Sequence, residues 1–173
     1  MTRLFVLLAA LWFAIGSAEA GAPFRFASID GGDIDLADWA GRPVLVVNTA
    51  SRCGFTRQFD DLQALYDRFR DRGLVVLAVP SGDFRQELAT NAEVAAFCAV
   101  NFDLDLPMTE ITRVRGPDAH PFYRWLEQTH GFVPAWNFNK VLLDGKGRMV
   151  GTWGSATRPT SGPLVRAIEP LLK

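Results

Sequence analysis

Residues 44–58 of this chain are Val44-Leu45-Val46-Val47-Asn48-Thr49-Ala50-Ser51-Arg52-Cys53-Gly54-Phe55-Thr56-Arg57-Gln58. The first four are apolar and mostly β-branched, which predicts a buried strand over 44–48. Apolar residues then recur at helical spacing, so a helix is expected over 56–70. Cys53 therefore lies on a strand-to-helix turn, where unpaired backbone N–H groups and the helix dipole stabilise a thiolate. A thiolate in this place is a nucleophile, and we expect the chemistry there.

The composition indicates one globular domain. The chain has 173 residues, enough for one substantial core and too few for two ordinary domains. Its net charge is −1, and the charged residues are spread along the sequence. The absence of a basic stripe argues against a nucleic-acid partner, and the absence of an acidic run argues against disorder.

The first twenty residues differ from the rest. Arg3 gives a positive start, residues 4–15 are almost wholly apolar, and Ala18-Glu19-Ala20 places small residues where a signal peptidase cleaves. This pattern predicts a secretory signal peptide over 1–20, cleaved after Ala20, and a mature domain over 21–173 that is periplasmic or secreted and has no stable membrane association. The alternative is an uncleaved anchor, although the apolar stretch is shorter than the ~20 residues that span a bilayer.

The remaining periodicities predict an α/β fold with a mixed central sheet and helices on both faces. A capping box at Thr90–Glu93 begins a helix that carries Cys98. Alternation of strand and helix early in the chain predicts a parallel strand pair, and a late hairpin adds antiparallel strands. The other expected elements are a hairpin with a Gly-Gly turn over 24–35, a helical turn over 36–40, a strand over 74–79, an extended piece over 104–107, a helix over 117–129, strands over 141–143 and 149–153, and a helix over 163–172.

The two cysteines, Cys53 and Cys98, are 45 positions apart in the sequence. Thr56 stands where a Cys-x-x-Cys pair would have its second cysteine. A single reactive thiolate suits peroxide cleavage, because it becomes a sulfenic acid that a second thiol can condense to a disulfide. The alternative is one permanent structural bridge between Cys53 and Cys98.

Residues 48–56 closely resemble the signature of the glutathione peroxidase family, and Trp136-Asn137-Phe138-Asn139-Lys140 resembles its second signature. The resemblance covers residues 24–172. It implies a thioredoxin-like fold and reduction of hydrogen peroxide or organic hydroperoxides by a thiol. Further matches in register between the two signatures are Pro80, residues 84–87, residues 97–98 and residues 106–107.

The resemblance implies a role for each matching residue. Cys53 is the expected peroxidatic residue, and Trp136 and Asn137 are its expected polar partners. The indole N–H and the side-chain amide can both donate to a thiolate or to the departing oxygen. The alternative for Trp136 is a buried core tryptophan.

Cys98 matches the position of the resolving cysteine in non-selenium members of the family, which take electrons from thioredoxin-type proteins rather than from glutathione. A disulfide needs Cα atoms within about 7 Å. We therefore expect the helix that begins near Asn91 to loosen during turnover. The alternative is an inert cysteine on a helix face, because free cysteine is among the most buried residue types.

Asp83 departs from the family pattern, which has Gln at this position, and Ser81-Gly82 replace the usual Cys-Asn. An ionised carboxylate cannot donate a hydrogen bond and repels a thiolate. The side chain could be turned away, be protonated, or accept the proton of the thiol. A donor such as Ser81 or Gln86 could replace the missing amide.

The sequence predicts no metal site and no bound cofactor. His120 and His130 lie at the two ends of a predicted helix, look peripheral, and have no matching carboxylates. Arg52, Arg57 and Lys140 could steer an acidic partner or substrate, although such residues are usually solvated surface.

The leading hypothesis is an extracytoplasmic thiol peroxidase whose reductant is a thioredoxin-like protein or glutathione. The short connection over 100–117 leaves little room for an assembly element and favours a monomer. Two other hypotheses use the same scaffold: a thiol–disulfide redox relay, and a non-catalytic binding domain.

Overall fold

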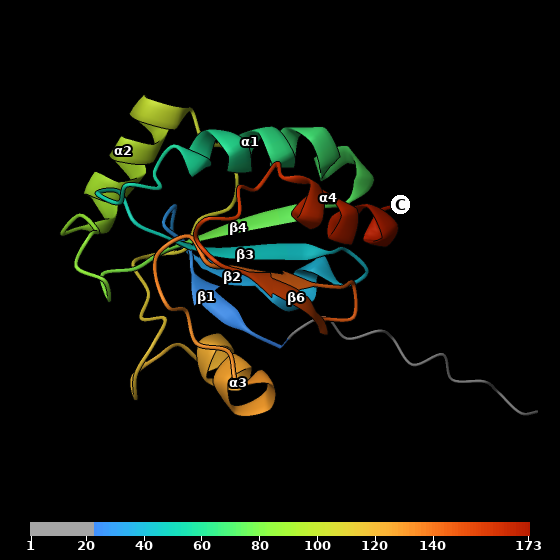
Figure 1. Ribbon diagram of the computed structural model, residues 1–173. Coiled ribbons are helices and arrows are strands. Elements are labelled where there is room, and N and C mark those ends of the chain that lie inside the picture. The colour runs from blue at the N-terminus through green and yellow to red at the C-terminus, as the bar shows by residue number, and fades with distance from the viewer. Residues whose placement is uncertain (1–22) are drawn as a thin grey trace, which may run out of the picture.

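A computed structural model describes residues 23–173 (Figure 1). The predicted signal peptide over 1–20 lies outside the described residues. The elements are β1 (Arg25–Ala27), β2 (Asp33–Asp35), the 3₁₀ turn η1 (Leu36–Trp39), β3 (Val44–Thr49), α1 (Gln58–Phe69), η2 (Arg70–Arg72), β4 (Val75–Pro80), α2 (Asn91–Phe102), α3 (Pro121–His130), β5 (Lys140–Leu143), β6 (Met149–Trp153), α4 (Gly162–Ile168) and η3 (Glu169–Leu171).

The central sheet has the strand order β4-β3-β5-β6. β3 and β4 run parallel, with Val44 opposite Val75. β5 is antiparallel to β3 and to β6. The predicted mixed sheet is confirmed, and β1 and β2 form a separate antiparallel hairpin.

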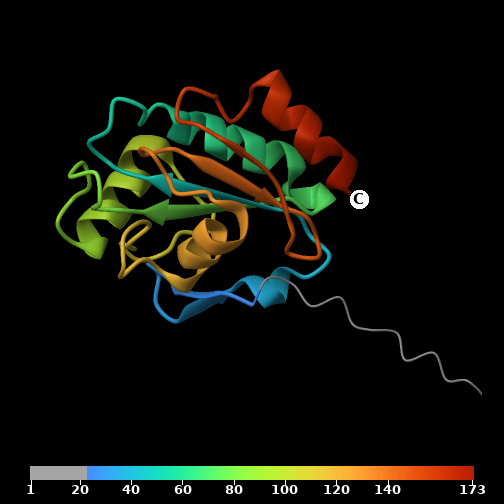
Figure 2. The same cartoon turned by 60° about the horizontal axis from the view of Figure 1, so that its bottom comes forward.

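Layers cover both faces of this sheet. α1 and α4 lie on one face, and α3 with the β1–β2 hairpin lies on the other (Figures 1 and 2). Side chains alternate across β3, so Leu45 and Val47 join the core cluster under α1, while Val44 and Val46 join the cluster on the opposite side. This burial on both faces explains why the strand is a continuous apolar run.

Local signals account for several boundaries. The capping box of α2 is confirmed, because Thr90 Oγ1 accepts from the N–H of Glu93 (3.2 Å) and the Glu93 carboxylate accepts from the N–H of Thr90 (3.0 Å). Gly31 and Gly32 both have positive φ, as the predicted hairpin turn requires.

Other boundaries differ from the prediction. α1 begins at Gln58 rather than at 56. α3 begins at Pro121 rather than at 117, because His120 Nδ1 accepts from the N–H of Phe122 (3.2 Å) and caps the helix there. Residues 104–107 form no named strand, although the N–H of Ala78 donates to the carbonyl of Pro107 (2.9 Å).

Within residues 23–173, no helix combines the length and the apolar character that crossing a membrane requires.

Candidate active site

Cys53 lies in the loop after β3 and is only 4% exposed. The N–H of Phe55 donates to its Sγ over 3.5 Å, and the N–H of Thr56 donates to its carbonyl over 3.1 Å. α1 begins five residues beyond Cys53, later than predicted, and the influence of a helix dipole falls off within one turn. The loop amide of Phe55, rather than the first turn of α1, is therefore the donor beside the thiol.

The Cys53 loop is joined to the segment that leads into α2. The N–H of Arg52 donates to the carbonyl of Gln86 (2.8 Å), and the N–H of Ser51 donates to Oε1 of Glu87 (3.0 Å). Both loops lie at the end of the sheet beside α2 (Figures 1 and 2). These two hydrogen bonds hold the thiol loop against the start of the helix that carries Cys98.

Asn137 reaches the same place from the loop before β5. Its side chain is fully buried, and its Nδ2 donates to Oε1 of Gln86 (2.9 Å). Its Oδ1 is buried without a hydrogen-bond partner among the described residues. Asn137 is therefore linked to the Cys53 loop through Gln86, whereas the hydrogen bond to the sulfur comes from the N–H of Phe55.

Asn48, at the end of β3, positions the Trp136–Asn139 segment. Its Nδ2 donates to the carbonyl of Trp136 (2.9 Å), and its Oδ1 accepts from the N–H of Asn139 (3.1 Å). Phe138 has φ +59°, a left-handed backbone conformation that is uncommon outside glycine. Asn48 of the first signature thereby holds the Trp136–Asn139 segment of the second signature at the end of β3.

Trp136 is a surface residue and not a core tryptophan. It is 41% exposed, and its ring lies 5.3 Å from the ring of Phe84. The indole is thus held at the rim of the site by an aromatic neighbour from the loop after β4.

Asp83 is turned toward a backbone segment. Its Oδ2 accepts from the N–H groups of Val114 (2.7 Å) and Arg115 (3.2 Å). Both hydrogen bonds come from the backbone of residues 114–115 and engage the same carboxylate oxygen. Of the three possibilities that the sequence left open, the structure shows the side chain turned away.

Cys98 is buried on α2 at 2% exposure, and both cysteines are free thiols. The structure therefore describes the reduced protein, without the permanent bridge that the sequence left possible. Burial raises the pKa of the Cys98 thiol to about 12, and the charge of Glu87 adds to the effect.

Lys140 and His120 are both built into the fold. Lys140 is fully buried, and its Nζ donates to Oε1 of Gln58 (2.5 Å) and to the carbonyl of Thr157 (2.6 Å). Burial lowers its pKa to about 8. Its proposed role in steering an acidic partner is wrong, because residue type alone does not reveal burial. His120 is half-buried and stacks on Phe26, with ring centroids 3.8 Å apart.

An open pocket of about 390 Å³ lies next to the Cys53 loop. It is lined by Gly54, Phe55, Arg57, Gln58, Asp61, Ala156 and Arg158. Phe55 gives it an apolar wall, and Arg57 and Arg158 give it positive charge. Arg158 is already engaged by Asp61 through two bonds of 2.8 Å.

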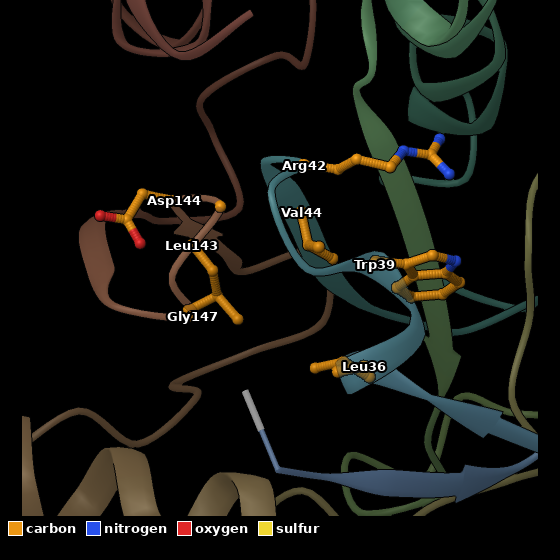
Figure 3. A pocket seen from close by; sticks show the side chains of 8 residues that line it. Leu36, Trp39, Arg42, Val44, Leu143, Asp144 and Gly147 are labelled. Atoms are coloured by element: carbon orange, nitrogen blue, oxygen red, sulfur yellow. The ribbon is translucent and has the colours of Figure 1, made fainter. Parts of the chain in front are cut away.

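A second, much smaller pocket of about 10 Å³ lies between η1, the start of β3 and the β5–β6 turn (Figure 3). Val44 lines it, whereas Cys53 follows the other end of the same six-residue strand. A strand of that length spans roughly 16 Å, so this pocket is separate from the thiol. Within residues 23–173, no group of three or more His, Cys, Asp or Glu side chains is arranged to hold a metal ion.

Comparisons with known proteins agree with this geometry. The family model described as glutathione peroxidase matches residues 23–127. The chain is 38% identical over 160 residues to a hydroperoxy fatty acid reductase from Synechocystis, covering 86% of this chain and 94% of that protein. It is 36% identical over 161 residues to a glutathione peroxidase-like peroxiredoxin from Saccharomyces cerevisiae, covering 90% and 91%.

The solved structure of T. cruzi GPX1 superimposes with a TM-score of 0.65 at 28% identity, covering 86% of this chain and 93% of that one. Together with the mixed sheet and its flanking helices, this likeness confirms the predicted thioredoxin-like fold.

Proposed function

The chain belongs to the glutathione peroxidase family and is a thiol peroxidase. We propose that Cys53 is the residue that attacks the peroxide. The thiolate would attack the terminal oxygen of a hydroperoxide and break the O–O bond. Cys53 would become a sulfenic acid, and the departing alkoxide or hydroxide would take a proton to leave as alcohol or water.

The observation that carries this assignment is that Gln86 joins the Cys53 loop to the loop that holds Asn137. Gln86 accepts from Arg52, next to Cys53, and from Asn137 in the second signature. The side-chain amide of Asn137 carries two N–H donors, and one of them binds Gln86. The other can be directed toward the sulfur or the departing oxygen. The exposed indole of Trp136 supplies a further donor at the rim.

We propose that Cys98 resolves the sulfenic acid as an intramolecular disulfide with Cys53. The burial of Cys98 on α2 supports the expectation that the helix must loosen first. Its capping box is a local arrangement of Thr90 and Glu93, so the first turn of α2 can open without breaking the sheet.

A disulfide product favours a thioredoxin-like protein as reductant over glutathione, because thiol–disulfide exchange with a dithiol regenerates both cysteines in one encounter. We propose that the protein acts as a monomer outside the cytoplasm, after loss of residues 1–20. The basis for this location is the pattern of Arg3, the apolar run and Ala18–Ala20.

We propose organic hydroperoxides, including fatty acid hydroperoxides, as substrates alongside hydrogen peroxide. One relative is named a hydroperoxy fatty acid reductase. The open pocket beside Gly54 and Phe55 offers space for an alkyl chain near the thiol, and Arg57 offers a counter-charge for a carboxylate.

The first experiment is to measure the mass of the reduced protein, residues 21–173, after one equivalent of hydrogen peroxide without any other thiol. We expect a loss of two hydrogens and one peptide pair that links Cys53 to Cys98. Cys98→Ser should instead gain one oxygen and stop turning over with a thioredoxin-like reductant. Peroxide consumption that survives in Cys53→Ser would overturn the assignment of the nucleophile.

A further inference from the structure

Glu87 connects the segments that carry the two cysteines. Its Oε1 accepts from the N–H of Ser51 in the Cys53 loop (3.0 Å) and from the N–H of Leu88 ahead of α2 (2.8 Å). Leu88 packs against the core cluster that contains both Cys53 and Cys98. The carboxylate is therefore fixed in place between the Cys53 loop and the approach to α2.

The second oxygen of this carboxylate is the less engaged one. Oε2 of Glu87 is buried and makes no hydrogen bond of ordinary length and angle within residues 23–173, although the hydroxyl of Ser51 lies close enough to favour the ionised carboxylate. Burial raises the pKa of Glu87 above its usual range, while Ser51, the N–H of Leu88 and the charge of Arg52 act in the opposite direction. A less engaged oxygen on a carboxylate with a raised pKa is well suited to accept a proton.

The resolving step is helped by such an acceptor. While Cys98 is packed on α2, burial holds the pKa of its thiol at about 12, so almost no thiolate is present there at neutral pH. The thiolate, and not the thiol, attacks sulfur. Glu87 is the charged group whose field acts on Cys98, and Arg52 is the charged group that acts on Glu87.

We propose that Glu87 accepts the proton of Cys98 during disulfide formation, an inference that rests on the proposed resolving role of Cys98. As the S–H proton moves to Oε2 of Glu87, the sulfur of Cys98 attacks the sulfur of the Cys53 sulfenic acid. The S–O bond breaks, and the departing hydroxide takes the proton from Glu87 and leaves as water. The sum is one sulfenic acid and one thiol giving one disulfide and one water.

The position of Glu87 fits this sequence of events. α2 begins at Asn91, so Glu87 lies outside the helix and stays bonded to Ser51 while the helix loosens. The proton acceptor thereby remains beside Cys53 as Cys98 arrives.

The test compares Glu87→Gln with the wild-type protein, using rapid mixing with hydrogen peroxide and quenching with an alkylating agent, so that sulfenic acid and disulfide are counted by mass. Glutamine keeps an oxygen for Ser51 and Leu88 but cannot accept the proton. We expect disulfide formation to slow about 100-fold, with sulfenic acid formation changed less than about threefold. The matched control is Glu93→Gln, which retains the capping box of α2.

The pH profile separates proton transfer from a structural effect. The wild-type rate of disulfide formation should level off above the pKa of Glu87, whereas the Glu87→Gln rate should keep rising about tenfold per pH unit toward the pKa of Cys98. Equal slowing of both steps, equal slowing in Glu93→Gln, or identical pH profiles would each show that Glu87 is only structural. If the wild-type protein forms sulfenic acid but no disulfide, the resolving role of Cys98 is wrong, and this inference is wrong with it.

Discussion

The side-chain amide of Asn137 donates to Oε1 of Gln86 over 2.9 Å, although the two residues are 51 positions apart in the sequence. The carbonyl of Gln86 accepts in turn from the N–H of Arg52, the neighbour of Cys53. Gln86 is thus the residue through which the second signature reaches the thiol loop.

Replacing Gln86 by Leu should slow sulfenic acid formation, because Asn137 loses the acceptor that orients its amide. We expect the rate of sulfenic acid formation to fall about tenfold or more, because removing a single catalytic hydrogen-bond donor lowers kcat by about 10²–10³. Rapid-mixing measurements of peroxide consumption check this. Gln63→Leu on α1 is the matched control, since Gln63 contacts Asp67 and Asp105 instead of the site. Equal rates in the two variants would exclude an orienting role for Gln86.

Replacing Asp83 by Ala should affect stability more than chemistry. The N–H groups of Val114 and Arg115 would lose their acceptor, at a cost of about 1–3 kcal/mol in the free energy of unfolding. Asp83→Asn keeps an acceptor oxygen and should cost less. Urea unfolding gives the free energies, and the rate of sulfenic acid formation should stay within about threefold. A large loss of that rate in Asp83→Asn, with normal stability, would show that the carboxylate takes part in the chemistry.

Lys140 should make stability depend on alkaline pH. Its folded pKa of about 8 lies below the 10.5 of an unperturbed lysine, so between these values the unfolded chain holds the proton more often than the folded one. Stability therefore rises with pH in this window, by up to about 3 kcal/mol from this group. A neutral amine can still donate to Gln58 and Thr157.

The measurement is the difference in unfolding free energy between the wild-type protein and Lys140→Met across this window. The difference removes the opposing effect of Cys98, whose raised pKa lowers stability as pH rises. A difference that does not change with pH would mean that the buried amine has an ordinary pKa.

His120 should make stability depend on mildly acidic pH. Burial lowers its pKa below 6.5, and the ring must be neutral for Nδ1 to accept from Phe122 while Nε2 donates to the carbonyl of Arg25. As pH falls below 6.5, the unfolded chain takes up the proton before the folded one, and stability falls. His120→Asn keeps a capping oxygen without titrating. The difference in unfolding free energy between the wild-type protein and His120→Asn should be smaller at about pH 5 than at about pH 7.5. A difference that stays the same at both pH values would contradict the assignment.

Local patterns predicted most of the fold. The apolar run before Cys53 became β3, the capping box at Thr90 began α2, and the predicted late hairpin became β5 and β6. Each of these depends on residues close together in the sequence. The predicted starts of α1 and α3 were wrong by two and four residues, because turns and a histidine cap replaced the first helical residues.

The sequence by itself determined where the proposed nucleophile stands and which fold carries it, because strand and helix periodicity and the residues of a turn act locally. Only the tertiary structure decided which residues contact the Cys53 loop. Gln86, Glu87 and Asn137 meet this loop because parallel β3 and β4 end side by side, with Asn48 holding the segment before β5 against them. The burial of Lys140 and the orientation of Asp83 toward residues 114–115 also result from contacts between segments that are distant in the sequence. Hydrogen bonds between distant segments depend on how the sheet aligns its loops, and no local pattern in the chain encodes that alignment.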